Sequence, residues 1–157
     1  MKNADEGVIL NACTAIEVLM TPSSTSKKHS GKSGDIILEN LIDLMVRHGG
    51  LASLSSQIRQ EGNSDIKKAA LKVLSRLLSH GSQNLKELVV DEIKRLKLVS
   101  FCASQVERFP DEVVDEEVLI CLLEVLALAS AKSKTLTKYL TDEGTINKIA
   151  VQLTIVF

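Results

Sequence analysis

Apolar residues recur every three or four positions along most of this chain, a spacing that places them on one face of an α-helix. Glycine, serine, asparagine and aspartate interrupt the spacing at sites where helices commonly begin or end. Together these signals predict helices over residues 5–20, 35–48, 51–61, 65–79, 83–97, 98–109, 115–131, 133–142 and 144–157. We expect Asp5 and Asp35 to cap the first two helices, because an aspartate can accept hydrogen bonds from the free N–H groups at a helix start.

Residues 21–34 (TPSSTSKKHSGKSG) break the pattern, since serine, threonine, glycine and lysine dominate them. A polar stretch of this kind predicts an exposed, flexible insertion. Its serines and threonines lie beside Lys27, Lys28 and Lys32, so phosphorylation would cancel positive charge there. Two hypotheses stay open for this segment: a site of regulation by phosphorylation, or a plain flexible insertion.

The helical pattern itself repeats. Setting Val8, Ile66 and Val118 on one another aligns three long helices. The other aligned trios are Ala12, Ala70 and Leu122; Ala15, Val73 and Val125; Ile16, Leu74 and Leu126; and Leu19, Leu77 and Ala129. A second set of helices aligns Leu51 with Leu98 and Ile146, and Leu54 with Phe101 and Ile149. The unit spans roughly 50 residues, which is in the range of helical repeat arrays. A simple helical bundle would not need one pattern three times in the same order.

Three segments resemble the armadillo repeat family. The stretch GGLASL (49–54) is similar to the Gly-Gly-Ile/Leu-x-x-Leu start of that family's second helix, and DEGTINKI (142–149) is similar to an Asp-x-Gly-x-Ile-x-x-Ile variant. Residues 65–79 resemble the family's third helix. The resemblance implies an all-α chain folded as a right-handed α-solenoid of about three armadillo-like or HEAT-like repeats, with residues 1–157 forming one domain. It also implies a scaffold or adaptor that binds a protein partner in a groove along its third helices.

In armadillo proteins a tryptophan and an asparagine from each third helix contact a bound peptide. The positions that match the tryptophan are Thr14, Lys72 and Glu124, and those that match the asparagine are Val18, Arg76 and Leu128. Because the asparagine ladder is missing, recognition of any peptide through its backbone is not expected. Lys72 and Arg76 between apolar neighbours would suit an amphipathic helix or an acidic segment. The alternative hypothesis is that these residues form a solvated helix face without a partner.

Composition narrows the classes of function. The net charge of −1 favours neither nucleic acid nor an anionic membrane surface as a partner. Only 3% of the residues are aromatic, so aliphatic side chains must fill the core. Cys13, Cys102 and Cys121 are far apart in apolar helical stretches. We therefore expect buried, unreactive thiols and a reducing compartment, the cytoplasm or the nucleus.

The titratable residues form no pattern typical of catalysis, so neither enzyme activity, nor a cofactor, nor a metal is expected. His48 and His80 each precede a glycine at a predicted helix end, where a polar or cationic ring completes the last turn and glycine takes the left-handed conformation. His29 lies in the polar insertion without neighbouring ligands. The acidic residues Asp111, Glu112 and 115–117 suit the positive end of the helix that follows.

Both ends of the chain are apolar, and residues 151–157 read VQLTIVF. The end helix of a solenoid usually has a polar outer face, since no further repeat covers it. Two explanations follow: the chain is a segment of a longer repeat protein, or another copy of the chain covers the ends in a homo-oligomer. We favour the first, and the second makes self-assembly the alternative function.

Overall fold

A computed structural model describes residues 2–21, 31–109, 115–142 and 144–156, and all regular secondary structure in these ranges is helical. The helices are α1 (Lys2–Met20), α2 (Gly31–Arg47), α3 (Gly50–Arg59), α4 (Ser64–Ser79), α5 (Gln83–Arg95), α6 (Leu98–Arg108), α7 (Glu116–Lys132), α8 (Lys134–Asp142) and α9 (Thr145–Val156). The all-α class is confirmed. Within the described ranges, no helix combines the length and the apolar character that crossing a membrane would need.

Two predicted boundaries at the start of the chain are wrong. Helix α1 begins at Lys2, so Asp5 lies within its first turns and is not the cap. Helix α2 begins at Gly31, so residues 31–34 are helical and Asp35 is not a cap either. The helical pattern there extends over polar residues, which the periodicity of apolar side chains cannot detect. Residues 22–30 of the polar insertion, with His29 and most of the residues in the phosphorylation hypothesis, lie outside the described residues, as do Asp111 and Glu112.

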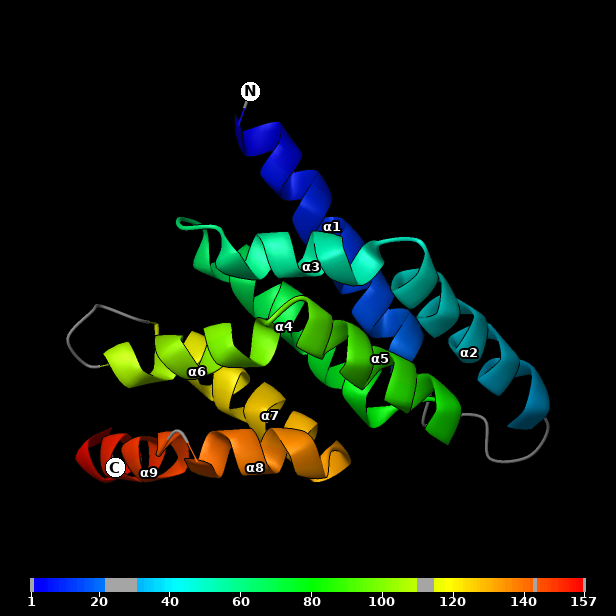
Figure 1. Cartoon of the computed structure of the whole chain (residues 1–157). Coiled ribbons are helices and arrows are strands. Elements are labelled where there is room, and N and C mark those ends of the chain that lie inside the picture. Colours follow the sequence, from blue (N-terminus) through cyan, green and yellow to red (C-terminus); the bar gives the residue numbers. More distant parts are fainter. Residues whose placement is uncertain (1, 22–30, 110–114, 143, 157) are drawn as a thin grey trace.

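Helices α1, α4 and α7 lie side by side in that order, with α4 between the other two (Figure 1). Helix α3 packs on α4, and α6 packs in the same way on α7. Further contacts join α2 to α3 and α5, α5 to α4, α6 and α7, α6 to α9, and α8 to α7 and α9. The N-terminal helix therefore forms one end of the molecule, and α8 with α9 forms the opposite end (Figure 1).

Helix α4 is the centre of the hydrophobic core. The side chain of Asn63 caps its first turn by accepting hydrogen bonds from the N–H groups of Asp65, at 2.9 Å, and Ile66, at 3.3 Å. Leu71, Val73, Leu74, Leu77 and Leu78 are each 0% exposed. Burying one such side chain contributes about 1.5–3 kcal/mol. Because α4 has helices on several sides, nearly its whole apolar surface contributes to the core.

The aligned face of α1 is the largest departure from the predicted core. Val8 is 67% exposed and Leu19 is 64% exposed, whereas the aligned Ile66 and Leu77 of α4 are 5% and 0% exposed. Ala12 and Ala15 are exposed as well. The buried residues of α1 are Cys13 and Met20. The physical reason is that α1 packs closely against α4 alone, so only one side of the helix is covered.

Similar local features recur at the aligned positions. The caps of α4 and α7, Asn63 and Asp115, occupy the same place in the alignment, and each accepts a hydrogen bond from an N–H in the first turn. The turns before α3, α6 and α9 each include a residue of positive φ directly before the helix: Gly49 (80°), Lys97 (52°) and Gly144 (68°). The repetition seen in the sequence therefore extends to the backbone conformation of the turns.

Candidate functional site

The six residues predicted to bind a partner lie on the three helices that pack in a row. They are Thr14 and Val18 on α1, Lys72 and Arg76 on α4, and Glu124 and Leu128 on α7. Thr14, Val18, Lys72 and Glu124 are exposed. Arg76 and Leu128 are half-buried, and Leu128 packs against the core. Each of the three helices therefore has an exposed side chain at one aligned position, the one occupied by Thr14, Lys72 and Glu124.

Lys72 lies close enough to α7 for its charge to act on the thiol of Cys121, where it partly opposes the effect of burial on the thiol pKa. Burial is the larger effect, and the pKa of Cys121 is raised. Thr14 donates a hydrogen bond to the carbonyl oxygen of Leu10 at 2.9 Å, so its hydroxyl group is engaged by its own helix. Lys72, Arg76 and Glu124 are therefore the charged groups that this row offers to a partner.

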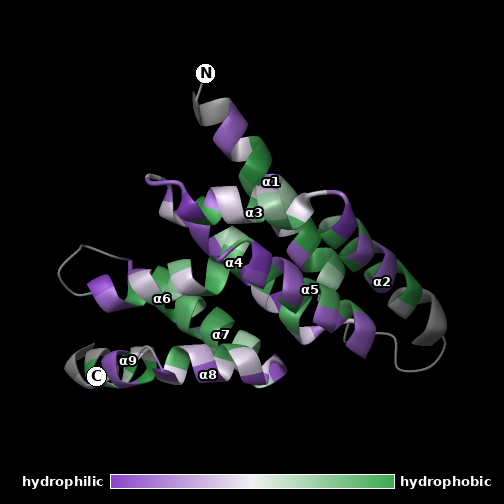
Figure 2. Ribbon diagram, viewed as in Figure 1, coloured by the Kyte–Doolittle hydropathy of each residue, from purple (hydrophilic) through white to green (hydrophobic). Residues whose placement is uncertain are grey.

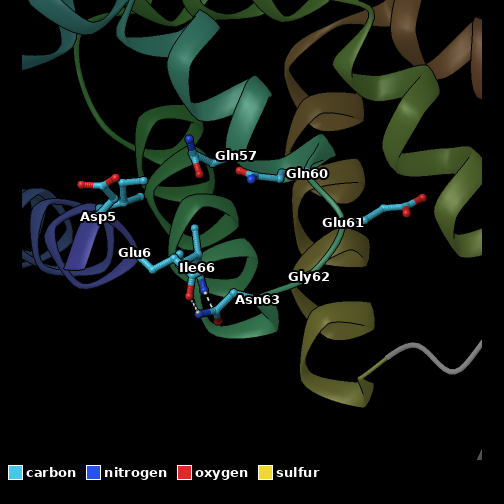
Figure 3. Close-up of a pocket in the computed structure, with 9 residues that line it drawn as sticks. Asp5, Glu6, Gln57, Gln60, Glu61, Gly62, Asn63 and Ile66 are labelled. Atoms are coloured by element: carbon cyan, nitrogen blue, oxygen red, sulfur yellow. Dashed lines mark hydrogen bonds between the residues drawn. The ribbon is translucent and has the colours of Figure 1, made fainter. Parts of the chain in front are cut away.

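A cavity of about 320 Å³ lies beside this row, between the start of α1, the end of α3 and the start of α4 (Figure 3). Its walls include Asp5 and Glu6 from α1, Gln57 from α3, and Gln60 and Glu61 from the turn between α3 and α4. Ile66, which is buried, forms part of its floor. A volume of this size is at the lower end of the range for ligand-binding pockets.

The polar groups of this first cavity are mostly hydrogen-bond acceptors. Glu6 turns toward Asn63, whose amide Nδ2 donates to Glu6 Oε2 at 3.2 Å (Figure 3). Gln57 Oε1 is buried and accepts no hydrogen bond. Within the described part of the chain, no lysine, arginine or histidine forms an ion pair with the three carboxylates of the cavity.

A second cavity, of about 260 Å³, lies between the end of α6 and the starts of α4 and α7. Glu61 and Gly62 line both cavities, so the turn between α3 and α4 separates them. The alignment that superposes the third helices also relates the two sites, because Glu6 corresponds to Ser64, Ile9 to Lys67, and Ile66 to Val118. The second cavity therefore lies at positions that the alignment relates to the first, but it includes the cations Arg59, Lys67 and Arg108.

Arg59 fixes the wall of the second cavity. Its Nη2 donates to the carbonyl oxygens of Leu96, at 2.6 Å, and Lys97, at 3.2 Å. Its guanidinium carbon lies 4.7 Å from the centre of the Phe101 ring, a favourable cation–π distance. Arg59 therefore connects the end of α3 to the turn between α5 and α6.

A cluster of charges joins α4 to α7 below this cavity. Lys68 Nζ lies 2.9 Å from Glu117 Oε2, 3.0 Å from Asp65 Oδ1 and 3.5 Å from Asp115 Oδ2. The hydrogen bonds to Glu117 and Asp65 raise the pKa of Lys68 above its usual range. The pKa of Asp115 is lowered, first by the hydrogen bond from the Glu117 N–H and then by the charge of Lys68.

Burial shifts the pKa values of the three cysteines and of His80. Cys13, Cys102 and Cys121 are buried as predicted, and burial raises the thiol pKa of each, to about 12 for Cys102. Burial, Arg76 and Lys86 lower the pKa of His80, so its ring is neutral and acts as a polar group, not as a cation. Among the described residues, no three His, Cys, Asp or Glu side chains are grouped to hold a metal ion.

The sequence alignment gave six candidate residues, which lie on α1, α4 and α7, and it predicted neither cavity. Asn63 and Glu6, which meet in the first cavity, are 57 positions apart. Their contact depends on the position of α1 along the axis of α4, which the periodicity of either helix does not determine. Comparisons with known proteins found no matching family model, no matching curated protein and no matching solved structure.

Proposed function

We propose that this chain is an α-solenoid of about three armadillo-like repeats and works as a non-enzymatic scaffold that binds a protein segment along its third helices. The row of α1, α4 and α7 supports the proposal, because a repeat that cannot cover its apolar face alone is stabilised by stacking on the next one. Three buried thiols suit a reducing compartment, the cytoplasm or the nucleus.

The observation that carries the proposal is the exposure of Thr14, Lys72 and Glu124 at one aligned position on three adjacent helices. In a stacked array, equivalent positions form a line across the surface. Such a line can contact an extended or helical segment at regular intervals. Lys72 and Arg76, one turn apart at its centre, favour a partner segment with acidic residues.

The test is a binding assay with a panel of labelled acidic, neutral and amphipathic helical peptides. We expect acidic or amphipathic peptides to bind the wild-type chain. We expect the double variant Lys72→Glu/Arg76→Glu to bind them at least tenfold more weakly, since the exposed attraction becomes repulsion.

The matched control is Lys134→Glu/Lys138→Glu, which reverses two exposed charges at the same spacing on α8. This control should keep wild-type affinity. Equal loss of binding in both variants would show that the change in net charge alone explains the loss. Unchanged binding in the Lys72/Arg76 variant would rule out the third-helix groove.

A self-assembly module is the alternative, and exposed apolar residues on the first two helices favour it. Val18 on α1 is 67% exposed, and Ile36 and Ile37 on α2 are 58% and 60% exposed. Hydrophobic segments of α1 and α2 lie at this edge of the molecule (Figure 2). Light scattering coupled to size-exclusion chromatography distinguishes the two functions: a dimer that dissociates in Leu19→Glu supports self-assembly, whereas a monomer removes it.

A further inference from the structure

We infer that the two adjoining cavities bind a single extended segment of a protein partner, with a lysine or arginine side chain in the first cavity and an acidic side chain in the second. The inference rests on the proposed function as a protein-binding scaffold. It places the binding site on both sides of the turn between α3 and α4, with α6 along the second cavity. The residues that bind would differ from the third-helix row of Thr14, Lys72 and Glu124.

Charge selects the occupant of the first cavity. Asp5 and Glu6 carry two negative charges on its α1 wall, whereas Glu61, which lines both cavities, extends its side chain away from these two (Figure 3). The N-terminus of α4 contributes only about half of a positive elementary charge. The carboxylates therefore dominate the potential, and a cationic side chain is favoured over an anionic one.

Hydrogen bonding points to the same occupant. The buried oxygen Gln57 Oε1 accepts no hydrogen bond, and leaving a buried acceptor unsatisfied costs about 1–3 kcal/mol. Glu6 accepts from Asn63 through one carboxylate oxygen, Oε2. A guanidinium or ammonium group presents several N–H donors and no acceptor, which matches these walls.

The second cavity has the opposite preference. Lys67 lines it and forms no ion pair with a described residue, and Arg59 places its guanidinium at the wall. Of the two carboxylates there, Asp115 is engaged by Lys68 at 3.5 Å. An acidic side chain from the partner would pair with Lys67.

The distance between equivalent sites sets the spacing in the partner. Packed helices lie about 8–10 Å apart, and a chain in the extended polyproline II conformation advances about 3.1 Å per residue with three residues per turn, so side chains three positions apart point to the same side. One unit of the stack therefore corresponds to about three residues. A segment with a basic and an acidic side chain three positions apart would reach both cavities at once.

The experiment uses three peptide libraries with two residues fixed three positions apart and the others varied. The fixed pairs are arginine with glutamate, arginine twice, and glutamate twice. We expect selection on the full chain to enrich the mixed pair, in either order, about tenfold over the like-charged pairs. Equal enrichment of the three libraries, or of none, would overturn the inference.

Variants of the chain then locate the site on a selected peptide. Asp5→Asn/Glu6→Gln and, separately, Lys67→Glu should each weaken binding about tenfold, because each removes or reverses charge pairs between the peptide and exposed or half-buried side chains. The control Glu87→Gln/Asp142→Asn, which neutralises two exposed carboxylates on α5 and α8, should have no effect.

The outcomes separate this inference from the proposed function. Loss of binding in the cavity variants but not in Lys72→Glu/Arg76→Glu supports the cavities and removes the third-helix groove. The reverse pattern leaves the scaffold function in place and overturns the cavity site. Free arginine that binds as tightly as the peptide would also overturn it, in favour of a site for small cations.

Discussion

Lys97 is the one residue other than glycine that adopts a positive φ, 52°, within the described ranges. A side chain costs about 1–2 kcal/mol in this left-handed conformation. Gly49 and Gly144 occupy the equivalent turns before α3 and α9 without that cost. The hydrogen bond from Arg59 to the Lys97 carbonyl oxygen helps to hold the turn in place.

We therefore expect Lys97→Gly to stabilise the protein by about 0.5–1 kcal/mol, the relief of strain less the added flexibility of the unfolded chain. Urea denaturation followed by circular dichroism measures the change. Lys138→Gly, in the interior of α8, is the control and should destabilise by about 1 kcal/mol. Destabilisation in both variants would mean that Lys97 is not strained.

Asp115 belongs to the charge cluster that joins α4 to α7, because its carboxylate lies 3.5 Å from Lys68 Nζ. Its pKa in the folded chain lies below the usual 3.8, so its charge stabilises the fold above that pH. The contribution is lost as the pH falls through the lowered value. Asparagine can cap a helix as well as aspartate can, as Asn63 does for α4, but it carries no charge for Lys68.

Asp115→Asn should lower the melting temperature at pH 6, and the difference from the wild type should shrink as the pH falls below 3.8. Thermal melts over a series of pH values provide the measurement. A difference that stays constant down to pH 2 would show that the charge of Asp115 does not stabilise the fold.

At the scale of the helices, equivalent sequence positions have different environments. Leu77 of α4 is 0% exposed, while the aligned Leu19 of α1 is 64% exposed. Leu77→Ala should cost about 2–5 kcal/mol. Leu19→Ala should change stability by less than about 0.5 kcal/mol, because it removes little buried surface. Chemical denaturation of both variants compares them, and a cost above 2 kcal/mol for Leu19→Ala would show that another copy covers α1 in solution.

This contrast shows what the sequence can predict. Residues 65–79 and 115–131 were recognised as helices, and their apolar faces as core, because each helix is covered on most sides and its full pattern is used. The same pattern in α1 predicted a buried face that is largely exposed. The reason is that periodicity shows which face is apolar but not whether a neighbouring helix covers it. Val8 and Leu19 have the right spacing but lack the neighbours that Ile66 and Leu77 have.

For the whole molecule, the decisive distinction is between an open row and a closed bundle. In the row, α4 contacts both α1 and α7 and lies between them (Figure 1). The alignment alone gives the equivalent positions on α1, α4 and α7, but not how exposed each side chain is, since Arg76 and Leu128 are half-buried. The two cavities were not predictable, because Glu6 and Asn63 come together only through the packing of α1 on α4.

Distances between spin labels on Thr14→Cys, Lys72→Cys and Glu124→Cys, taken in pairs, test the open row most directly. The native thiols are buried with raised pKa values, so brief labelling modifies the exposed new cysteines. With helices about 8–10 Å apart, the separation of α1 from α7 should be roughly 16–20 Å, about twice that of either adjacent pair. Three nearly equal distances would show a closed bundle and contradict the repeat architecture.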